Sequence, residues 1–182
     1  MRKVVAILIL IVGLGVVSCG QLSNNDPHIP STVAGANSIT AIAYGNSKFV
    51  AVGWNHIMAY STDGVNWTAL GNNPFQGIFC IVYGNNLFIA GGFNGKLAYS
   101  PDGIDWTTMP DSPFETSCVR AIAYGNGRFV AVGQGGRIAY STDGITWTAV
   151  RDNRFGTSDI NSVVYGNNRF ILGNEQGMIF YL

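Results

Sequence analysis

The sequence predicts an all-β fold, a β-propeller of about four four-stranded blades whose last blade is incomplete. The main observation is an internal repeat of about 40 residues, the length of one propeller blade. Tyrosines recur in it at intervals of 39, 41 and 41 residues, and tryptophans at intervals of 39 and 41. The 24 glycines indicate many tight turns. Runs such as Phe129–Val132 are continuously apolar, as expected for strands buried on both faces between neighbouring blades.

Residues 1–18 have the features of an export signal and are excluded from the fold. Arg2 and Lys3 precede the apolar run Val4–Val17, which has 14 residues, fewer than the roughly 20 that span a membrane. The run ends in Val-Val-Ser-Cys, which resembles the lipobox of bacterial lipoproteins. This resemblance implies that Cys19 is acylated and becomes the N-terminus. The alternative is an ordinary secretory signal in which Cys19 has no special role.

We therefore expect an exported protein that is lipid-anchored to the bacterial cell envelope, with the membrane contacted through this anchor. Gly20 after the cysteine is similar to the sorting pattern for the outer membrane, if the host has two membranes. Residues 19–36 are polar and contain Pro27 and Pro30, so they are expected to form a tether before the propeller domain at 37–182.

Each repeat unit contains four short strand-like runs separated by turn residues. In the third unit they are Ala121–Tyr124, Arg128–Val132, Arg137–Ser141 and Thr146–Val150. The first turn reads Gly-Asn-x, which supplies the positive-φ residues of a tight hairpin. The third turn reads Ser-x-Asp-Gly, which predicts a type I turn with its glycine in the left-handed region.

The fourth unit has no run for a fourth strand before Leu182. A strand near residues 29–33 is a candidate for closing that blade, although Pro30 restricts it to an edge position. We expect a single four-bladed ring. The alternative is an open arc that completes its ring by oligomerising.

The third turn and the tryptophan after it resemble the Asp-box, or BNR, repeat of sialidase-type propellers. The matching segments are Ser61–Trp67, Ser100–Trp106 and Ser141–Trp147, each with one residue fewer before the glycine than the usual pattern. The resemblance implies a structural role, in which the aspartate caps the turn and the tryptophan packs between strands. The residues concerned are Asp63, Trp67, Asp102, Trp106, Asp143 and Trp147.

Composition and residue types argue against several function classes. Without residues 1–18 the chain has eight basic and ten acidic side chains and no basic stripe, so no nucleic-acid partner is expected. The two histidines are isolated in sequence, so neither a metal nor another cofactor is expected. A sialidase would need three clustered arginines and a Tyr–Glu pair, and Glu115 and Glu175 pair with no tyrosine by sequence. Cys80 is expected to be buried, and a disulfide between Cys80 and Cys118 is left open.

The informative residues are those that break the repeat in the loops after the second strand of each unit. These loops and the inter-blade loops are expected to share one face, which suits a binding surface. Ordinary loop variation is the alternative. The candidate ligand-binding residues are Trp54, Asn55, His56, Phe93, Asn94, Gln134, Glu175 and Gln176. Phe75, Phe114 and Phe155 recur eight residues after each tryptophan and are expected to be packing groups.

The leading hypothesis is a non-catalytic binding or adhesion module of the cell surface, with a protein or glycan ligand. The second is a structural assembly component that pairs through an open blade edge with copies of itself, as a homo-oligomer, or with another subunit. The third is a sialidase-like glycoside hydrolase.

Overall fold

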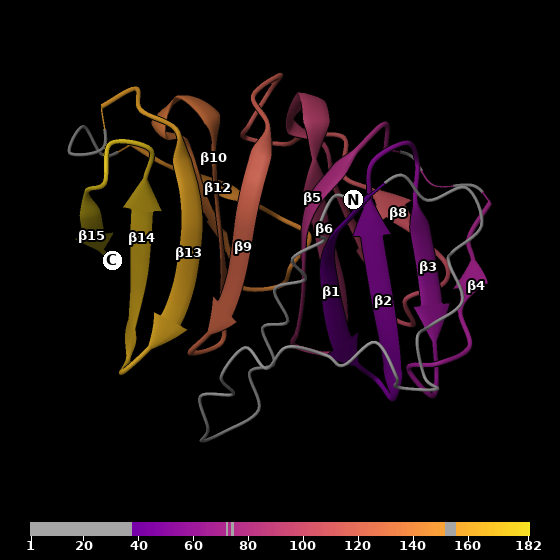
Figure 1. The fold of residues 1–182 in the computed structure, drawn as a ribbon. Coiled ribbons are helices and arrows are strands. Elements are labelled where there is room, and N and C mark those ends of the chain that lie inside the picture. Colours follow the sequence, from indigo (N-terminus) through magenta and orange to yellow (C-terminus); the bar gives the residue numbers. More distant parts are fainter. Residues whose placement is uncertain (1–37, 72, 74, 152–155) are drawn as a thin grey trace, which may run out of the picture.

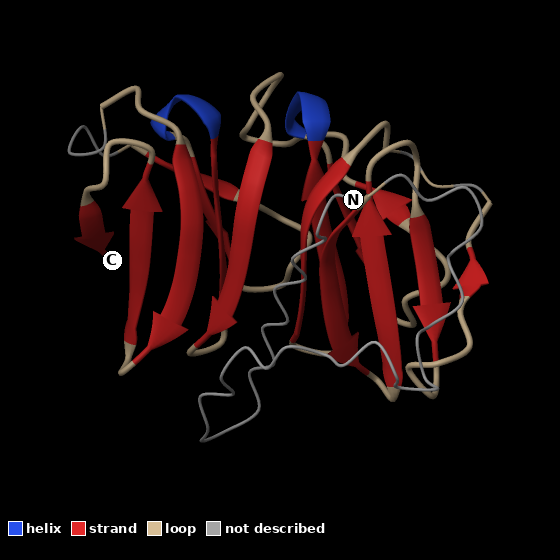
Figure 2. Cartoon of the chain, viewed as in Figure 1, coloured by secondary structure: helices blue, strands red, loops and turns tan. Residues whose placement is uncertain are grey.

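The computed structural model describes residues 38–71, 73, 75–151 and 156–182 (Figure 1). The predictions for the export signal, Cys19, the tether, the closing strand near residues 29–33 and Phe155 lie outside these ranges. The described chain is almost entirely strand and turn, with two single 3₁₀ turns, η1 (Phe93–Gly95) and η2 (Gln134–Gly136) (Figure 2). No helix in the described ranges is long and apolar enough to span a membrane.

Each repeat unit forms one antiparallel sheet, which we call blades 1 to 4. Blade 1 contains β1 (Ile39–Gly45), β2 (Lys48–Gly53), β3 (Met58–Ser61) and β4 (Thr68–Ala69). Blade 2 contains β5 (Ile78–Gly84), β6 (Leu87–Gly92), β7 (Leu97–Ser100) and β8 (Thr107–Thr108). Blade 3 contains β9 (Val119–Gly125), β10 (Arg128–Gly133), β11 (Ile138–Ser141) and β12 (Thr148–Val150). Blade 4 contains β13 (Ile160–Gly166), β14 (Arg169–Asn174) and β15 (Ile179–Tyr181).

The four blades form an open arc in the described residues. Their first strands pack in chain order, β1 on β5, β5 on β9 and β9 on β13, so that β1 and β13 stand at opposite ends of the row (Figure 1). The prediction of four blades, the last one incomplete, is confirmed. The expectation that they close on themselves as a single ring is wrong for the described residues, which follow the alternative of an open arc.

The first hairpin of every blade has the predicted tight turn. Asn46 and Ser47 have φ values of 44° and 58°, and the equivalent pairs in the other blades also have positive φ. Two successive positive-φ residues define the type I′ turn, whose twist matches that of antiparallel strands. The Ser-x-Asp-Gly turn has the predicted positive φ at its glycine, which is 74° for Gly64 and 77° for Gly144.

The core consists of three hydrophobic clusters, one between each pair of successive blades. Val50 meets Phe88 between blades 1 and 2, and Ile89 packs with Phe129 between blades 2 and 3. Phe170 and Leu172 contribute to the cluster between blades 3 and 4. Burying one such side chain stabilises the fold by about 1.5–3 kcal/mol. Because blades 2 and 3 contribute to clusters on both faces, their strands read as continuous apolar runs.

Phe75 and Phe114 are fully buried, as predicted for repeated packing groups. They lie in the loops that lead from one blade to the next, and Phe114 belongs to the cluster between blades 2 and 3. The inter-blade loops are therefore anchored to the core and hold the residues around them in place.

Candidate functional site

The loops after the second strand of each blade lie at the same end of the arc as the starts of the first strands, and we call this end the loop face. Four equivalent backbone hydrogen bonds fix the arrangement. The donors are the N–H groups of Trp54, Phe93, Gln134 and Glu175, and the acceptors are the carbonyls of Ser38, Gly77, Cys118 and Asp159, at 2.9–3.1 Å. In Figure 1 this face is the upper edge. The predicted sharing of one face by these loops and the inter-blade loops is confirmed.

An aromatic cluster lies on the loop face where blades 1 and 2 meet. The ring of Trp54 lies edge-on to Phe79 and Phe93, with centroids 5.4 and 5.1 Å away, and the two phenylalanine rings are 4.7 Å apart. Trp54 is 39% exposed, while both phenylalanines are half-buried. A Cβ at Gly77 would lie 2.8 Å from the Phe93 ring, so the cluster needs a glycine there.

The loop that carries Trp54 is held by its neighbour. Asn55 and His56 have positive φ values of 55° and 60°, which turn the chain tightly, and both are exposed. The side-chain amide of Asn73, from the loop between blades 1 and 2, donates to the carbonyl of His56. The Asn73 carbonyl oxygen accepts from the backbone N–H of Phe75 at 3.0 Å. Asn73 thereby links the Trp54 loop to the backbone of Phe75, whose side chain is fully buried.

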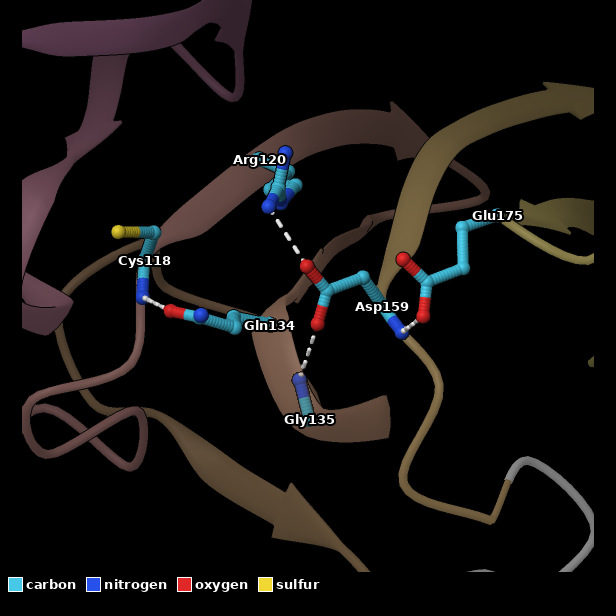
Figure 3. A network of polar contacts seen from close by, with 6 residues as sticks. All are labelled: Cys118, Arg120, Gln134, Gly135, Asp159 and Glu175. Atoms are coloured by element: carbon cyan, nitrogen blue, oxygen red, sulfur yellow. Dashed lines mark hydrogen bonds and ion pairs between the residues drawn. The ribbon is translucent and has the colours of Figure 1, made fainter.

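A polar network occupies the loop face where blades 3 and 4 meet (Figure 3). The guanidinium of Arg120 and the carboxylate of Asp159 form an ion pair of 2.6 Å, with their side chains 40% and 17% exposed. Asp159 also accepts from the backbone N–H of Gly135 at 2.9 Å, and its own N–H donates to Glu175 at 3.2 Å. The side-chain oxygen of Gln134 accepts from the Cys118 N–H at 3.4 Å. Asp159 is thus the centre of the network.

A bulge near the start of each first strand aims one side chain at this region. In all four blades the pairing of the first two strands shifts register at the same place. A bulge breaks the alternation of side chains along a strand and redirects one of them. The bulge residues are Thr40, Phe79, Arg120 and Asn161. Phe79 and Arg120 are therefore positioned by equivalent bulges to join the aromatic cluster and the polar network.

The structure brings the predicted candidates together in two groups. Trp54 and Phe93 join the aromatic cluster, and Gln134 and Glu175 join the polar network. Asn55, His56, Asn94 and Gln176 are exposed on the same loops. Phe79, Arg120 and Asp159 were not among the candidates. The sequence marks these residues only by variation, because the four repeat units carry four different residue types at the equivalent position. At the bulge, for example, the residues are Thr40, Phe79, Arg120 and Asn161.

The aspartates of the Ser-x-Asp-Gly turns bind the backbone at the opposite end of the arc. Oδ1 of Asp63 accepts from the N–H groups of Val65 and Asn66 at 2.9 and 2.7 Å, and Asp102 and Asp143 make the equivalent bonds. Trp106 and Trp147 pack against the clusters between blades. These contacts are the ones expected for residues that stabilise a turn and a blade.

The residues considered for a disulfide or for a sialidase site are not arranged for either chemistry. Cys80 and Cys118 are free thiols, so the disulfide between them is not formed, and burial raises the pKa of Cys80 to about 12. Glu115 pairs with Arg137 at 2.8 Å. Within the described residues, no group of three or more histidine, cysteine or acidic side chains is arranged to hold a metal ion.

A cavity of about 300 Å³ lies between blades 3 and 4, away from the loop face, and Val130, Tyr140 and Phe170 line it. In the preceding blades the equivalent space is filled by the Ser-x-Asp-Gly turn of the next blade. A Cβ on Gly103 would lie 2.6 Å from Val50, and one on Gly144 would lie 3.1 Å from Ile89. The cavity is therefore the place that such a turn occupies elsewhere in the arc.

Comparison with known proteins identifies the fold class. No family model and no curated protein matches the sequence. Among solved structures, the computationally designed Ika4 protein aligns with a TM-score of 0.62 at 16% identity, over 80% of this chain and 90% of Ika4. A chain of the nidogen/laminin complex aligns with a TM-score of 0.63 at 11% identity, and YCF48 bound to D1 peptide with 0.56 at 17%. These alignments cover 80% and 77% of this chain.

The protein therefore has a β-propeller fold with four blades, the last one incomplete. Its length spans only 59% of the nidogen/laminin chain and 48% of the YCF48 chain. At these identities the likeness concerns the fold alone.

Proposed function

We propose that this protein is a non-catalytic binding module of the cell surface that holds a peptide segment of a partner protein on its loop face. The observation that carries the proposal is the cluster of Trp54, Phe79 and Phe93, three aromatic residues at positions that break the repeat. Aromatic side chains dominate the energetics of protein interfaces because they bury a large area with few rotatable bonds. The Trp54 ring already has two aromatic neighbours, so little further ordering is needed for binding.

Polar groups further along the same face suit the backbone of a bound peptide. Asn94, Gln134 and Gln176 are exposed and carry amide groups that can both donate and accept. Arg120 and Asp159 add one charge of each sign, already paired with each other. Such a face favours a partner with alternating apolar and polar groups over one that is strongly charged.

The solved complex of YCF48 with D1 peptide supports the choice of a peptide over a glycan, because it shows a protein of the same fold class with a peptide ligand. The two proteins share 17% identity, so this support is for the type of ligand and not for the residues that bind it.

The place of action rests on the N-terminal residues. The apolar run Val4–Val17 followed by Cys19 supports export and acylation. The polar residues 20–36 would then separate the propeller from the membrane surface and leave the loop face accessible to a partner.

The test is a screen of the full chain on a peptide array and on a glycan array, with wild type and the variants Trp54→Ala, Phe93→Ala, Val65→Ala and Ile145→Ala. The last two are matched controls, because Val65 and Ile145 are exposed apolar residues in the turns opposite the loop face. We expect the wild type and both controls to bind the same peptides, and both aromatic variants to lose them. Binding to glycans alone would refute a peptide ligand, and peptide binding that survives both aromatic changes would refute the loop face.

A further inference from the structure

One contact is repeated at all three junctions between blades. The tyrosine at the end of each first strand lies on the glycine that ends the first strand of the preceding blade. A Cβ on Gly45 would lie 2.0 Å from Cγ of Tyr83, one on Gly84 would lie 2.2 Å from Tyr124, and one on Gly125 would lie 2.0 Å from Tyr165. Only a glycine leaves room for the ring, and we call each such contact a tyrosine seat.

The two ends of the arc carry the two unpaired halves of this contact. Gly166 of blade 4 has an empty seat, because nothing lies within 4 Å of a Cβ built there. Tyr44 of blade 1 is 47% exposed. Its ring packs on Phe49 at 4.6 Å, as Tyr83 packs on Phe88 at 4.7 Å. Tyr44 therefore packs on the same phenylalanine position of its own blade as the tyrosines that occupy a seat.

Apolar side chains elsewhere on the free sides of blades 1 and 4 are exposed where their equivalents in the other blades are buried. Ile39 on the free side of blade 1 is 39% exposed, while the equivalent residues in the other three blades are fully buried. Ile179 on the free side of blade 4 is 77% exposed, while the equivalent Leu97 is fully buried. Each end thus presents the apolar surface that an internal junction covers.

The polar contacts of a junction also have matching halves at the two ends. Between blades 1 and 2, the amide of Asn46 donates to the carbonyl of Pro101 at 3.2 Å. Burial works against the ionised form of Asp102, yet backbone hydrogen bonds and the positive charge of Lys48 lower the pKa of this carboxyl below its ordinary value. On blade 4 the residues equivalent to Asn46 and Lys48 are Asn167 and Arg169. On blade 1 the residues equivalent to Pro101 and Asp102 are Thr62 and Asp63.

We propose that a second copy of this chain packs head to tail against the first, with Tyr44 of each copy seated on Gly166 of the other. The same contact would bring Asp63 of one copy near Arg169 of its partner, so opposite charges meet at the new junction. The partner is a second copy because one chain carries both complementary surfaces.

The number of copies follows from symmetry. A head-to-tail contact repeats until the assembly closes. Propellers typically contain about four to eight blades, so two arcs of four blades make a ring within this range, whereas three arcs exceed it. The expected assembly is therefore a closed dimer, to which each copy would contribute its own loop face. This inference does not depend on the proposed ligand.

Cysteine cross-linking in cells that express the full chain tests the contact directly. The double variant Y44C/G166C is expected to form a covalent dimer under mild oxidation, and neither single variant should do so. The matched control is G45C/Y83C, an internal seat that should cross-link within one chain and remain at monomer mass. A Y44C/G166C chain that stays uncross-linked, or that cross-links at monomer mass, would overturn the proposal. A ladder of trimers and larger species would overturn the closed dimer.

A second measurement covers the case in which the cysteines disturb the fold. Sedimentation of the full chain in mild detergent should give twice the mass of one copy for the wild type. Gly166→Leu should weaken the dimer by about ten-fold or more, because the leucine occupies the seat, while the thermal melting temperature of the diluted monomer stays unchanged. A monomeric wild type would show that a further segment or a different subunit covers these ends, and would overturn the proposal.

Discussion

The carboxylate of Asp143 accepts a hydrogen bond of 2.8 Å from the backbone N–H of Ile145, and a second bond of 2.7 Å from Thr146. These backbone bonds are the main reason why the pKa of Asp143 falls from 3.8 to about 2, since they stabilise the ionised form. Asp63 has the same bonds, and its pKa also lies well below the ordinary value. The fold therefore favours the charged form of these turn carboxylates.

This predicts a loss of stability in acid. Because the pKa of Asp143 is lower in the folded state than in the unfolded state, its contribution is present above about pH 4 and is lost as the pH falls towards 2. Asp143→Asn keeps a side-chain oxygen for the turn but has no charge to titrate. We expect this variant to have a smaller decrease in urea midpoint between pH 5 and pH 2, to be measured at intervals of about one unit.

Asp111→Asn is the control for that experiment, because Asp111 is exposed and lies outside the turns. It should leave the pH dependence as in the wild type. Equal pH dependence of all three proteins would contradict the role assigned to Asp143.

A second prediction concerns the tyrosine seats. Gly125→Ala places a Cβ 2.0 Å from the ring of Tyr165, so the ring or the blade must shift. Overpacking of this kind costs about 1–3 kcal/mol. Gly166→Ala meets no atom within 4 Å and should leave the folded monomer as stable as the wild type. Urea denaturation at low protein concentration measures both, and a larger loss for Gly166→Ala would refute the assignment of the seats.

A third prediction separates the two kinds of tryptophan. Trp106 is partly buried and packs against the cluster between blades 1 and 2, so Trp106→Ala should cost up to about 3–5 kcal/mol, the range for a core tryptophan. Its Nε1 is buried without a hydrogen-bond partner, so Trp106→Phe should be much less harmful. Trp54→Ala removes a partly exposed ring on the loop face and should cost less than Trp106→Ala. Thermal melts decide, and the opposite order of Trp106→Ala and Trp54→Ala would mean that Trp54 serves the scaffold.

Much of the fold was predictable because the repeat shows each strand several times. In the third unit the predicted run Arg128–Val132 became the strand Arg128–Gly133, and the Gly-Asn turns followed from local conformational preference. The open arc was not predictable in this way. The rotation between successive blades depends on how side chains such as Tyr124 fit onto Gly84, and this glycine reads in the sequence only as a turn residue.

The loop face was predictable in part for a similar reason. Trp54 and Phe93 break the repeat within loops, so they were recognised as candidates. Phe79 and Arg120 also break it, but inside a strand, where alternation suggests an ordinary buried or exposed position. A bulge removes that alternation, and no single residue type in the sequence marks it.

A fourth prediction concerns the anchor. If Cys19 is acylated, metabolic labelling with a palmitate analogue should mark the full chain and should not mark Cys19→Ala. Cys118→Ala is the control for labelling of another cysteine that is not fully buried. Equal labelling of wild type and Cys19→Ala would contradict the lipoprotein assignment and leave the ordinary secretory signal.

The most direct test of the proposed function is the affinity of one array-selected peptide for the full chain, measured by titration calorimetry. Trp54→Ala should weaken binding by about ten-fold or more, because it removes the exposed ring of the aromatic cluster. Val65→Ala, in the turn at the opposite end of the arc, should bind like the wild type. An unchanged affinity for Trp54→Ala, in a variant whose thermal melt shows that it is folded, would contradict the proposal that the loop face holds the partner.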